Sequence, residues 1–241
     1  LTCRTYLQHT ALSTEWSGTF FAINGITGDY GGHTSPSIML AVIDPNTLTT
    51  WGTPFVDNSV SPSVILNPEN CFGQYNGDPE LCGNTSLIGR NRVHSFFVFN
   101  YYDPTQLDSL ASMLNNRIPD DHYILAYSYI PNNYGSSLLY TDSLYTAWPN
   151  TLFNSFQNLG ATGFIDQNQQ DDGFIFFCKK GDTSSAITKR SNEISPDFNA
   201  QSQLLELKTF FDNPNFTCIE VDDPAWAEQN WGTNNGQWTY S

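Results

Sequence analysis

Short runs of β-branched and aromatic residues, each ended by turn residues, recur along the chain and constrain its fold more than any other feature. In the clearest case, runs at Ile38–Ile43 and Thr49–Val56 flank the sequence DPNT. Proline presets the geometry of such a turn, and Asp and Asn tolerate it, so this segment predicts a β-hairpin. Further strands are predicted at VHSFFVFNY, which begins at Val93, within IPDDHYILAYSYI and at GFIFFCKK.

Two helices are predicted between these strands. In DPTQLDSLASMLNN, Asp103 is a natural N-cap, Pro104 suits the first turn and Gln106 occupies the capping-box position. The second helix is PNTLFNSFQNLG, with Asn150 as its expected cap and Gly160 at its end. The apolar residues expected to face inward are Leu107, Leu110, Ala111 and Leu114 in the first helix, and Leu152, Phe153, Phe156 and Leu159 in the second. Because strands dominate and helices alternate with strands only in mid-chain, the sequence predicts an α+β fold rather than a doubly wound one.

The chain has the size and composition of a packed domain. It contains 241 residues, of which 39% are hydrophobic and 15% aromatic, far more than a solvated tail would carry. We interpret residues 1–195 as one domain with an insertion-like loop at 57–92, which is rich in Pro, Asn, Gly and Ser. Residues 196–241 are less regular and are expected to be an appendage or a linker toward a further domain.

The charge of the chain argues against two classes of partner. Nine Lys and Arg against 24 Asp and Glu give a formal charge of −15. Such a charge repels phosphate backbones and anionic lipid headgroups, so we expect neither nucleic acid nor a membrane surface as a partner. No apolar run reaches the ~20 residues that a membrane-spanning helix needs. Leu1 opens no basic-then-apolar signal, and we expect a mature chain or one cut from a longer polypeptide.

The five cysteines leave several pairings open. Cys71 and Cys82 flank FGQYNGDPEL, a loop-like segment that either a local disulfide or two reduced thiols would suit. A disulfide there would contribute about 2–3 kcal/mol. Zinc is not expected, because the sequence has no Cys-x-x-Cys or His-x-His pair. Cys178 is expected to behave as a small buried hydrophobe, and the pairing of Cys3 and Cys218 stays open.

The familiar patterns of catalytic and cofactor sites do not occur in the sequence. No serine stands in a Gly-x-Ser-x-Gly elbow, and the glycines at 25–32 lie between expected strands instead of opening a helix. DQNQQDDGFIFF resembles a calcium loop, but Asp171 replaces the required Gly and Phe177 the bidentate Glu, so we interpret it as a hairpin turn. We therefore expect no catalytic residues, no metal and no cofactor.

Aromatic residues provide the candidate binding surface. Most buried aromatics belong to a core, but rings in loops can also stack on sugars or contact proteins. NNYGSSLLYTDSLYTAW is such a loop-like segment. The candidate binding residues are Trp148, Tyr134, Tyr140 and Tyr145.

Three segments in order resemble the interleukin-like epithelial–mesenchymal-transition inducer domain. They are SIMLAVIDPNTLTTWGTPFV, LDSLASMLNNRIPDDHYILAYSY and LFNSFQNLGATGFIDQNQQDDGFIFFCKKG. The shared pattern is a strand ending in an Asn/Asp-Pro-x-Thr turn, a helix, an Ile-Pro turn into a strand, a helix ending in Leu-Gly, and an aromatic strand before Lys-Lys-Gly. The resemblance covers roughly residues 15–190. It implies two packed antiparallel β-sheets flanked by two or three short helices, with no catalytic apparatus.

The resemblance also bears on IPDDHYILAYSYI, which places two aspartates and a histidine before a strand. Pro119 and Asp120 suit a turn from helix to strand. Asp121 stands where members of the family commonly have Gly, so we expect it near left-handed geometry. His122 is then expected to open a strand at the rim of the sheet, and the three residues are interpreted as a turn and not as a catalytic or metal site.

The function expected from the resemblance is recognition. Relatives include secreted cytokine-like proteins and a carbohydrate-binding stem domain of a glycosyltransferase. The sequence is closer to copies in large surface proteins of bacteria with type IX secretion, and NPNFTCIEVDDPAWAEQNW resembles the segment that closes leucine-rich repeat arrays in such proteins. The resemblance implies a non-enzymatic extracellular or cell-surface module that binds a glycan or another surface protein. The alternative is an accessory domain of a larger secreted peptidase or of a type IX secretion-associated surface protein.

Overall fold

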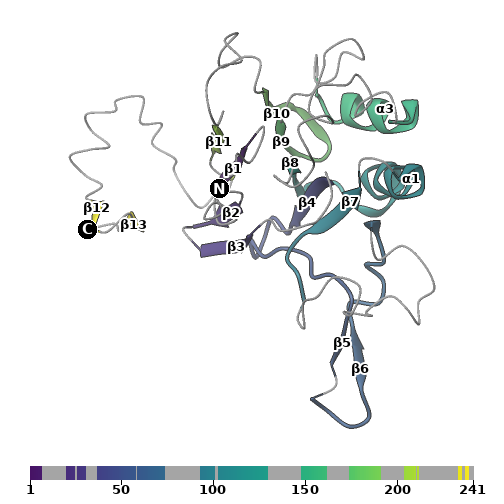
Figure 1. The fold of residues 1–241 in the computed structure, drawn as a ribbon. Coiled ribbons are helices and arrows are strands. Elements are labelled where there is room, and N and C mark those ends of the chain that lie inside the picture. The colour runs from purple at the N-terminus through teal and green to yellow at the C-terminus, as the bar shows by residue number, and fades with distance from the viewer. Residues whose placement is uncertain are drawn as a thin grey trace, which may run out of the picture.

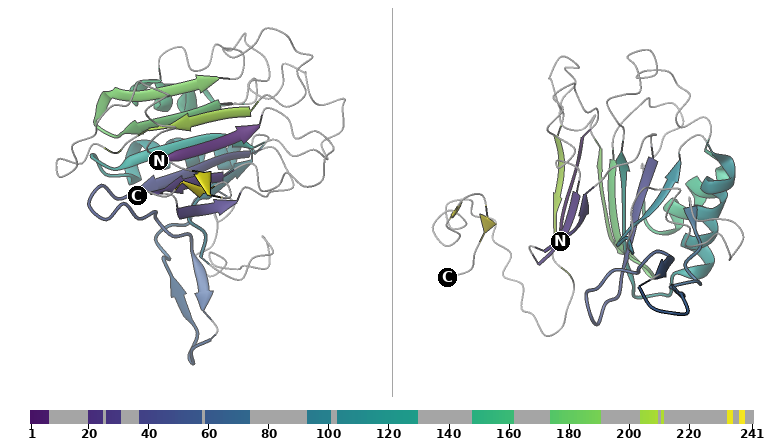
Figure 2. Two further views of the ribbon diagram at one scale, coloured as in Figure 1. Left: turned by 90° about the vertical axis from the view of Figure 1, so that its left-hand side faces the viewer. Right: turned by 60° about the horizontal axis from the view of Figure 1, so that its bottom comes forward.

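The chain forms two stacked β-sheets with helices against the outer face of the larger one (Figures 1 and 2). The structure is a computed structural model. It describes residues 1–6, 20–24, 26–30, 37–57, 59–73, 93–100, 103–129, 148–161, 174–190, 204–209, 211, 233–234 and 237–238. The α+β class with two main antiparallel sheets is confirmed.

The central sheet has five antiparallel strands in the order β10-β9-β8-β4-β7. Their bounds are β10 Asp182–Arg190, β9 Phe174–Lys179, β8 Tyr123–Tyr129, β4 Ser37–Ile43 and β7 Phe97–Asn100. β4 and β8 are buried along their whole length, as strands covered on both faces should be. Alternate residues face opposite layers, so that Ile38, Leu40 and Val42 pack toward the helices while Met39, Ala41 and Ile43 pack toward the second sheet.

The second sheet covers the face opposite the helices. Its four strands run in the order β11-β1-β2-β3, with bounds β11 Leu204–Lys208, β1 Thr2–Tyr6, β2 Phe20–Ile23 and β3 Ile26–Tyr30. Cys3, Phe21, Leu207 and Phe211 are buried between the two sheets. β11 and Phe211 come from the segment predicted to be an appendage, yet they pair with β1 and contribute to this core. Two pairs of short strands complete the described elements, β5 Phe55–Asp57 with β6 Val64–Leu66 and β12 Thr233–Asn234 with β13 Gln237–Trp238.

The helical layer consists of α1 Pro104–Ser112, its continuation as the π-helix η4 Met113–Arg117, and α3 Asn150–Asn158. The predicted cap of the first helix is confirmed, because the Asp103 carboxylate accepts hydrogen bonds from the backbone N–H groups of Thr105 and Gln106. Gln106 donates from Nε2 to Asp103 at 3.0 Å and accepts from the N–H of Asn100 at 2.8 Å. The cap therefore also ties the helix to the end of β7.

The end of α3 was predicted correctly and its beginning was not. Gly160 has a φ of 96° and follows the helix, as expected. The N-cap is Pro149, without a side-chain hydrogen bond, and the predicted cap Asn150 is the first helical residue. The eight apolar residues predicted to face inward in the two helices are all buried.

The predicted hairpin after β4 forms, but its paired part is short. It consists of the bridge Ile43↔Thr50 and two backbone hydrogen bonds, from the Asp44 N–H to the Thr49 carbonyl at 2.9 Å and from the Trp51 N–H to the Val42 carbonyl at 2.8 Å. β4 pairs with β8 along its whole length and with β7 only from Ser37 to Leu40. Pro54 has no N–H to contribute to a ladder, and the chain after it forms β5, which pairs with β6.

Candidate functional site

The pair β5 and β6 forms a hairpin that extends away from the two stacked sheets (Figures 1 and 2). Its register pairs Phe55 with Leu66, Val56 with Ile65 and Asp57 with Val64. We call residues 55–66 the arm. The sequence predicted a loop insertion from residue 57 onward, but β6 shows that the first part of this insertion is an ordered hairpin.

The arm carries an unusual group of exposed apolar side chains. All three residues of β6 are exposed, and β5 is only half-buried. Soluble proteins rarely gather large apolar side chains on the surface unless the patch contacts a partner. The exposed large hydrophobic residues in the described part of the chain all lie here: Val60 (46%), Val64 (46%), Ile65 (39%) and Leu66 (39%).

The base of the arm is held by a set of side-chain hydrogen bonds. The Asn67 amide donates to the Thr53 carbonyl at 3.1 Å, and the Asn70 amide donates to the Gly52 carbonyl at 2.9 Å. The Thr53 N–H donates to the His94 carbonyl, and the His94 N–H donates back to the Thr53 hydroxyl, both at 2.9 Å. Thr53, Asn70 and His94 are buried, and the bond from the His94 N–H to the Thr53 hydroxyl forms away from water, where a hydrogen bond is stronger.

Two glycines allow the close packing at this base. A Cβ on Gly52 would lie 2.6 Å from the Asn67 amide nitrogen and 2.7 Å from Val93 Cγ1. Gly73 has a φ of 64°, and a Cβ there would overlap the Val98 carbonyl oxygen. The chain thus leaves the body and returns to it through tightly packed backbone, which fixes the direction of the arm.

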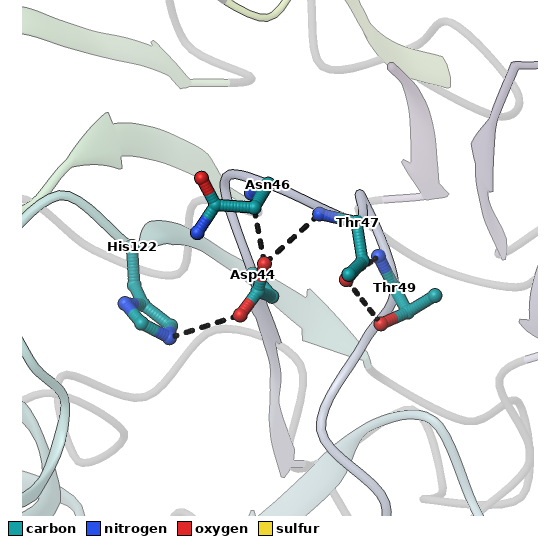
Figure 3. Close-up of polar contacts among 5 residues, drawn as sticks. All are labelled: Asp44, Asn46, Thr47, Thr49 and His122. Atoms are coloured by element: carbon teal, nitrogen blue, oxygen red, sulfur yellow. Dashed lines mark hydrogen bonds and ion pairs between the residues drawn. The ribbon is translucent and has the colours of Figure 1, made fainter.

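A second polar cluster lies where β4 ends and β8 begins (Figure 3). Asp44 Oδ1 accepts hydrogen bonds from the N–H groups of Asn46 at 2.8 Å and Thr47 at 2.9 Å. The bonds from Thr47 and Asn46 hold the pKa of the Asp44 carboxyl below its ordinary value. Asp44 Oδ2 lies 3.9 Å from His122 Nε2. The turn pattern around Asp44 does not predict this contact, which arises because Ile43 and Tyr123 are paired in register.

The His122 side chain is partly buried and packs against an aromatic ring. Its side chain is 15% exposed, and its Nδ1 atom is buried without a hydrogen-bond partner. The Trp51 and His122 rings form a T-shaped pair with centroids 5.7 Å apart, and the Arg117 guanidinium lies 5.8 Å from the Trp51 centroid. The Thr47 hydroxyl is hydrogen-bonded to the Thr49 hydroxyl at 2.7 Å.

The interpretation of Asp120, Asp121 and His122 as a turn is confirmed. Asp120 is exposed, and Asp121 has a φ of 69°. The Asp121 N–H donates to the Lys180 carbonyl and the Lys180 N–H donates to the His122 carbonyl, both at 2.8 Å. His122 directly precedes β8, as expected. No group of three or more His, Cys, Asp or Glu residues within the described ranges could hold a metal ion.

The predicted aromatic binding residues do not coincide with the arm. Trp148 is 4% exposed and packs against Phe153, Phe156 and Phe174 at centroid distances of 5.5, 6.4 and 6.2 Å. Its assignment as an exposed binding residue is therefore wrong, because the ring belongs to the core beneath α3. Three further predicted residues lie outside the described part of the chain, namely Tyr134, Tyr140 and Tyr145.

The described cysteines are not reactive thiolates. Cys3 and Cys178 are free and buried, as predicted for Cys178. Burial raises the pKa of both thiols, that of Cys178 to about 12. Cys71, which follows the base of the arm, is disulfide-bonded. Its predicted partner Cys82 lies outside the described residues, so the pairing of Cys71 with Cys82 stays a prediction. The calcium-like stretch before Phe174 also lies outside the described residues.

The fold and its arm define a class of protein, a two-sheet α+β module with a projecting hairpin. Comparison of the chain with models of protein families, with curated proteins and with solved structures found no match. The resemblance to the inducer domain therefore stays a prediction. Among the described helices, none is both long and apolar enough to cross a membrane.

Proposed function

We propose that the chain is a non-enzymatic recognition or assembly module, located outside the cell or on its surface, that binds another protein through the arm. The observation that carries the proposal is the exposure of Val64, Ile65 and Leu66 on a hairpin whose base is held in place. A rigid base lowers the entropy lost on binding, because the binding residues are already oriented.

The chemistry of the arm favours a protein over a glycan. Sugar hydroxyl groups need hydrogen-bond partners, and leaving them unpaired on binding is costly. The exposed large side chains of the arm are Val, Ile and Leu, which provide none. Aliphatic side chains and strand edges are, in contrast, what protein partners cover when they add a strand to a sheet.

The proposed location rests on the resemblance and not on the arm. The alternative function, an accessory domain of a larger secreted peptidase or of a type IX secretion-associated surface protein, uses the same surface. In that case the arm would contact the peptidase or a neighbouring domain.

Site-specific photo-crosslinking tests the proposal. A photoreactive amino acid at position 64 should form a covalent adduct with one defined protein, identified by mass spectrometry, when the full chain is added to surface extracts of its source cells. The same amino acid at the exposed position 157 on α3 is the matched control. Retention of a sugar on a glycan array that persists in an Ile65→Asp variant, with no adduct at position 64, would contradict protein binding through the arm.

A further inference from the structure

We propose that the protein bound by the arm is a second copy of the chain, with β6 pairing antiparallel to β6 of that copy about a two-fold axis. The two hairpins then form one four-stranded sheet. This inference rests on the proposed function, since it names the partner of the same surface. It follows from the edge, the side chains and the charge of the arm.

The edge of β6 is open to pairing. In the described part of the chain, β5 and β6 form a sheet of two strands, so β6 has one neighbour. Proteins protect exposed edges with Lys, Pro or bulges inside the strand. The central sheet shows such protection at its edge strand β10, which contains Lys189 and a register shift between Asp182 and Ile187. β6 reads Val-Ile-Leu and contains no Lys, Pro or bulge, so its shortness, three residues, is the one protection within the strand.

The side chains of β6 are complementary to themselves. A two-fold axis at Ile65 places Val64 of each copy opposite Leu66 of the other. The two copies of Ile65 then face each other. Within β6 every cross-strand pair is then apolar and no like charges meet, although a two-fold contact always brings a surface against its own copy. A second β6 can therefore cover the exposed side chains of the first.

The charge of −15 on each copy opposes close contact between the bodies, but the arm separates them. Ile65 is two residues from Asn67 at the base, and strands rise about 3.3 Å per residue, so the two bases would lie about 13 Å apart along the strands. The Debye length at physiological ionic strength is about 8 Å. Because this separation exceeds the Debye length, salt largely screens the repulsion between the two-sheet parts of the two copies when they meet through β6. Any broader contact would bring the acidic bodies together.

The expected dimer is weak. Four exposed large side chains on each arm make an interface well below the roughly 1,200 Å² of stable complexes. Sedimentation equilibrium of the purified chain, with concentrations extending into the high micromolar range, should show reversible dimers. Raising the salt concentration should leave association unchanged or strengthen it, because the remaining repulsion is screened.

Charge variants test the register. Val64→Glu with Leu66→Glu places like charges in both cross-strand pairs and should weaken association by more than about tenfold. Val64→Lys with Leu66→Lys should do the same, and mixing the two variants should restore dimers, because each pair then joins Glu to Lys. This restoration also excludes misfolding, including any caused by Glu at position 64 beside Asp57 of β5. The control Gln157→Glu, exposed on α3, should associate like the unmodified chain.

Three outcomes would overturn the inference: a monomer at every concentration, a dimer that survives both double variants, or no dimer on mixing. A monomer whose position-64 crosslinker labels a different protein would overturn self-pairing while supporting the proposed function. A monomer without any protein adduct at position 64 would overturn both.

Discussion

At the scale of single residues, the sequence predicted local backbone geometry well and long-range polar contacts poorly. Asp103 and Asp121 occupy the cap and the left-handed position expected of them, because capping and turn preferences depend on a few neighbouring residues. The contact of Asp44 with His122 joins residues that are 78 positions apart in the sequence. It depends on strand register, which no local pattern encodes.

Loss of the cap at Asp103 should destabilise the chain measurably. Asp103→Ala removes the acceptor for two N–H groups and a partner of Gln106. We expect a loss of about 1 kcal/mol in the free energy of unfolding, measured by urea denaturation. Asp103→Asn retains a good capping side chain and should lie near the unmodified chain. Equal losses in both variants would mean that the carboxylate acts by charge and not by capping.

The depressed pKa of Asp44 predicts a dependence of stability on pH. Its folded-state pKa lies below the ordinary value of 3.8, so the carboxylate stabilises the fold above that pH and loses this contribution as the pH falls through the folded-state pKa. The difference in unfolding free energy between the unmodified chain and Asp44→Asn should therefore be larger at pH 6 than at pH 3. Urea denaturation at both values measures it, and a difference that grows toward low pH would contradict the assignment.

At the scale of elements, strong apolar patterns were predictive, and the polar edge strand β10 was not predicted. β8, β9 and both helices have apolar runs or faces that match their burial. β10 is polar because it lies at the edge of the sheet, so it gave no strand signal. The hairpin after β4 is shorter than predicted, because turn residues specify a reversal of the chain but not how far the segments that follow stay paired.

The end of η4 offers a prediction about an element boundary. Lys180 Nζ donates to the Ile118 carbonyl at 2.5 Å and to the Asn115 carbonyl at 3.4 Å, so it caps carbonyls at the helix end. Lys180→Met should cost about 1 kcal/mol in unfolding free energy, since its ammonium is partly exposed. Lys179→Met is the matched control. Its ion pair with Asp121, at 3.4 Å, is exposed and should be worth less than about 0.5 kcal/mol.

At the scale of the whole molecule, the sequence and its family resemblance predicted two sheets with helices but not the arm. The helices and the second sheet each cover one face of the central sheet, and the alternation of Ile38 to Ile43 accounts for both cores. The segment 57–66 was interpreted as loop because Pro, Asn and Ser surround only three strand residues, Val64, Ile65 and Leu66. Nothing in a single sequence distinguishes such a short apolar run on the surface from one that is buried.

The same substitution in the arm and in the core should have different effects on the unfolding free energy if the arm's apolar side chains are not part of the folded core. Ile65 is 39% exposed, whereas Ile124 on β8 is fully buried. Ile65→Thr should change the unfolding free energy by less than about 0.5 kcal/mol, because Thr suits a strand and little burial is lost. Ile124→Thr should cost about 2–4 kcal/mol through lost packing and a buried hydroxyl. Urea denaturation at low protein concentration, where any dimer dissociates, measures both changes. Similar losses at both sites would show that the arm belongs to the folded core and would remove the reason to assign its apolar surface to a partner.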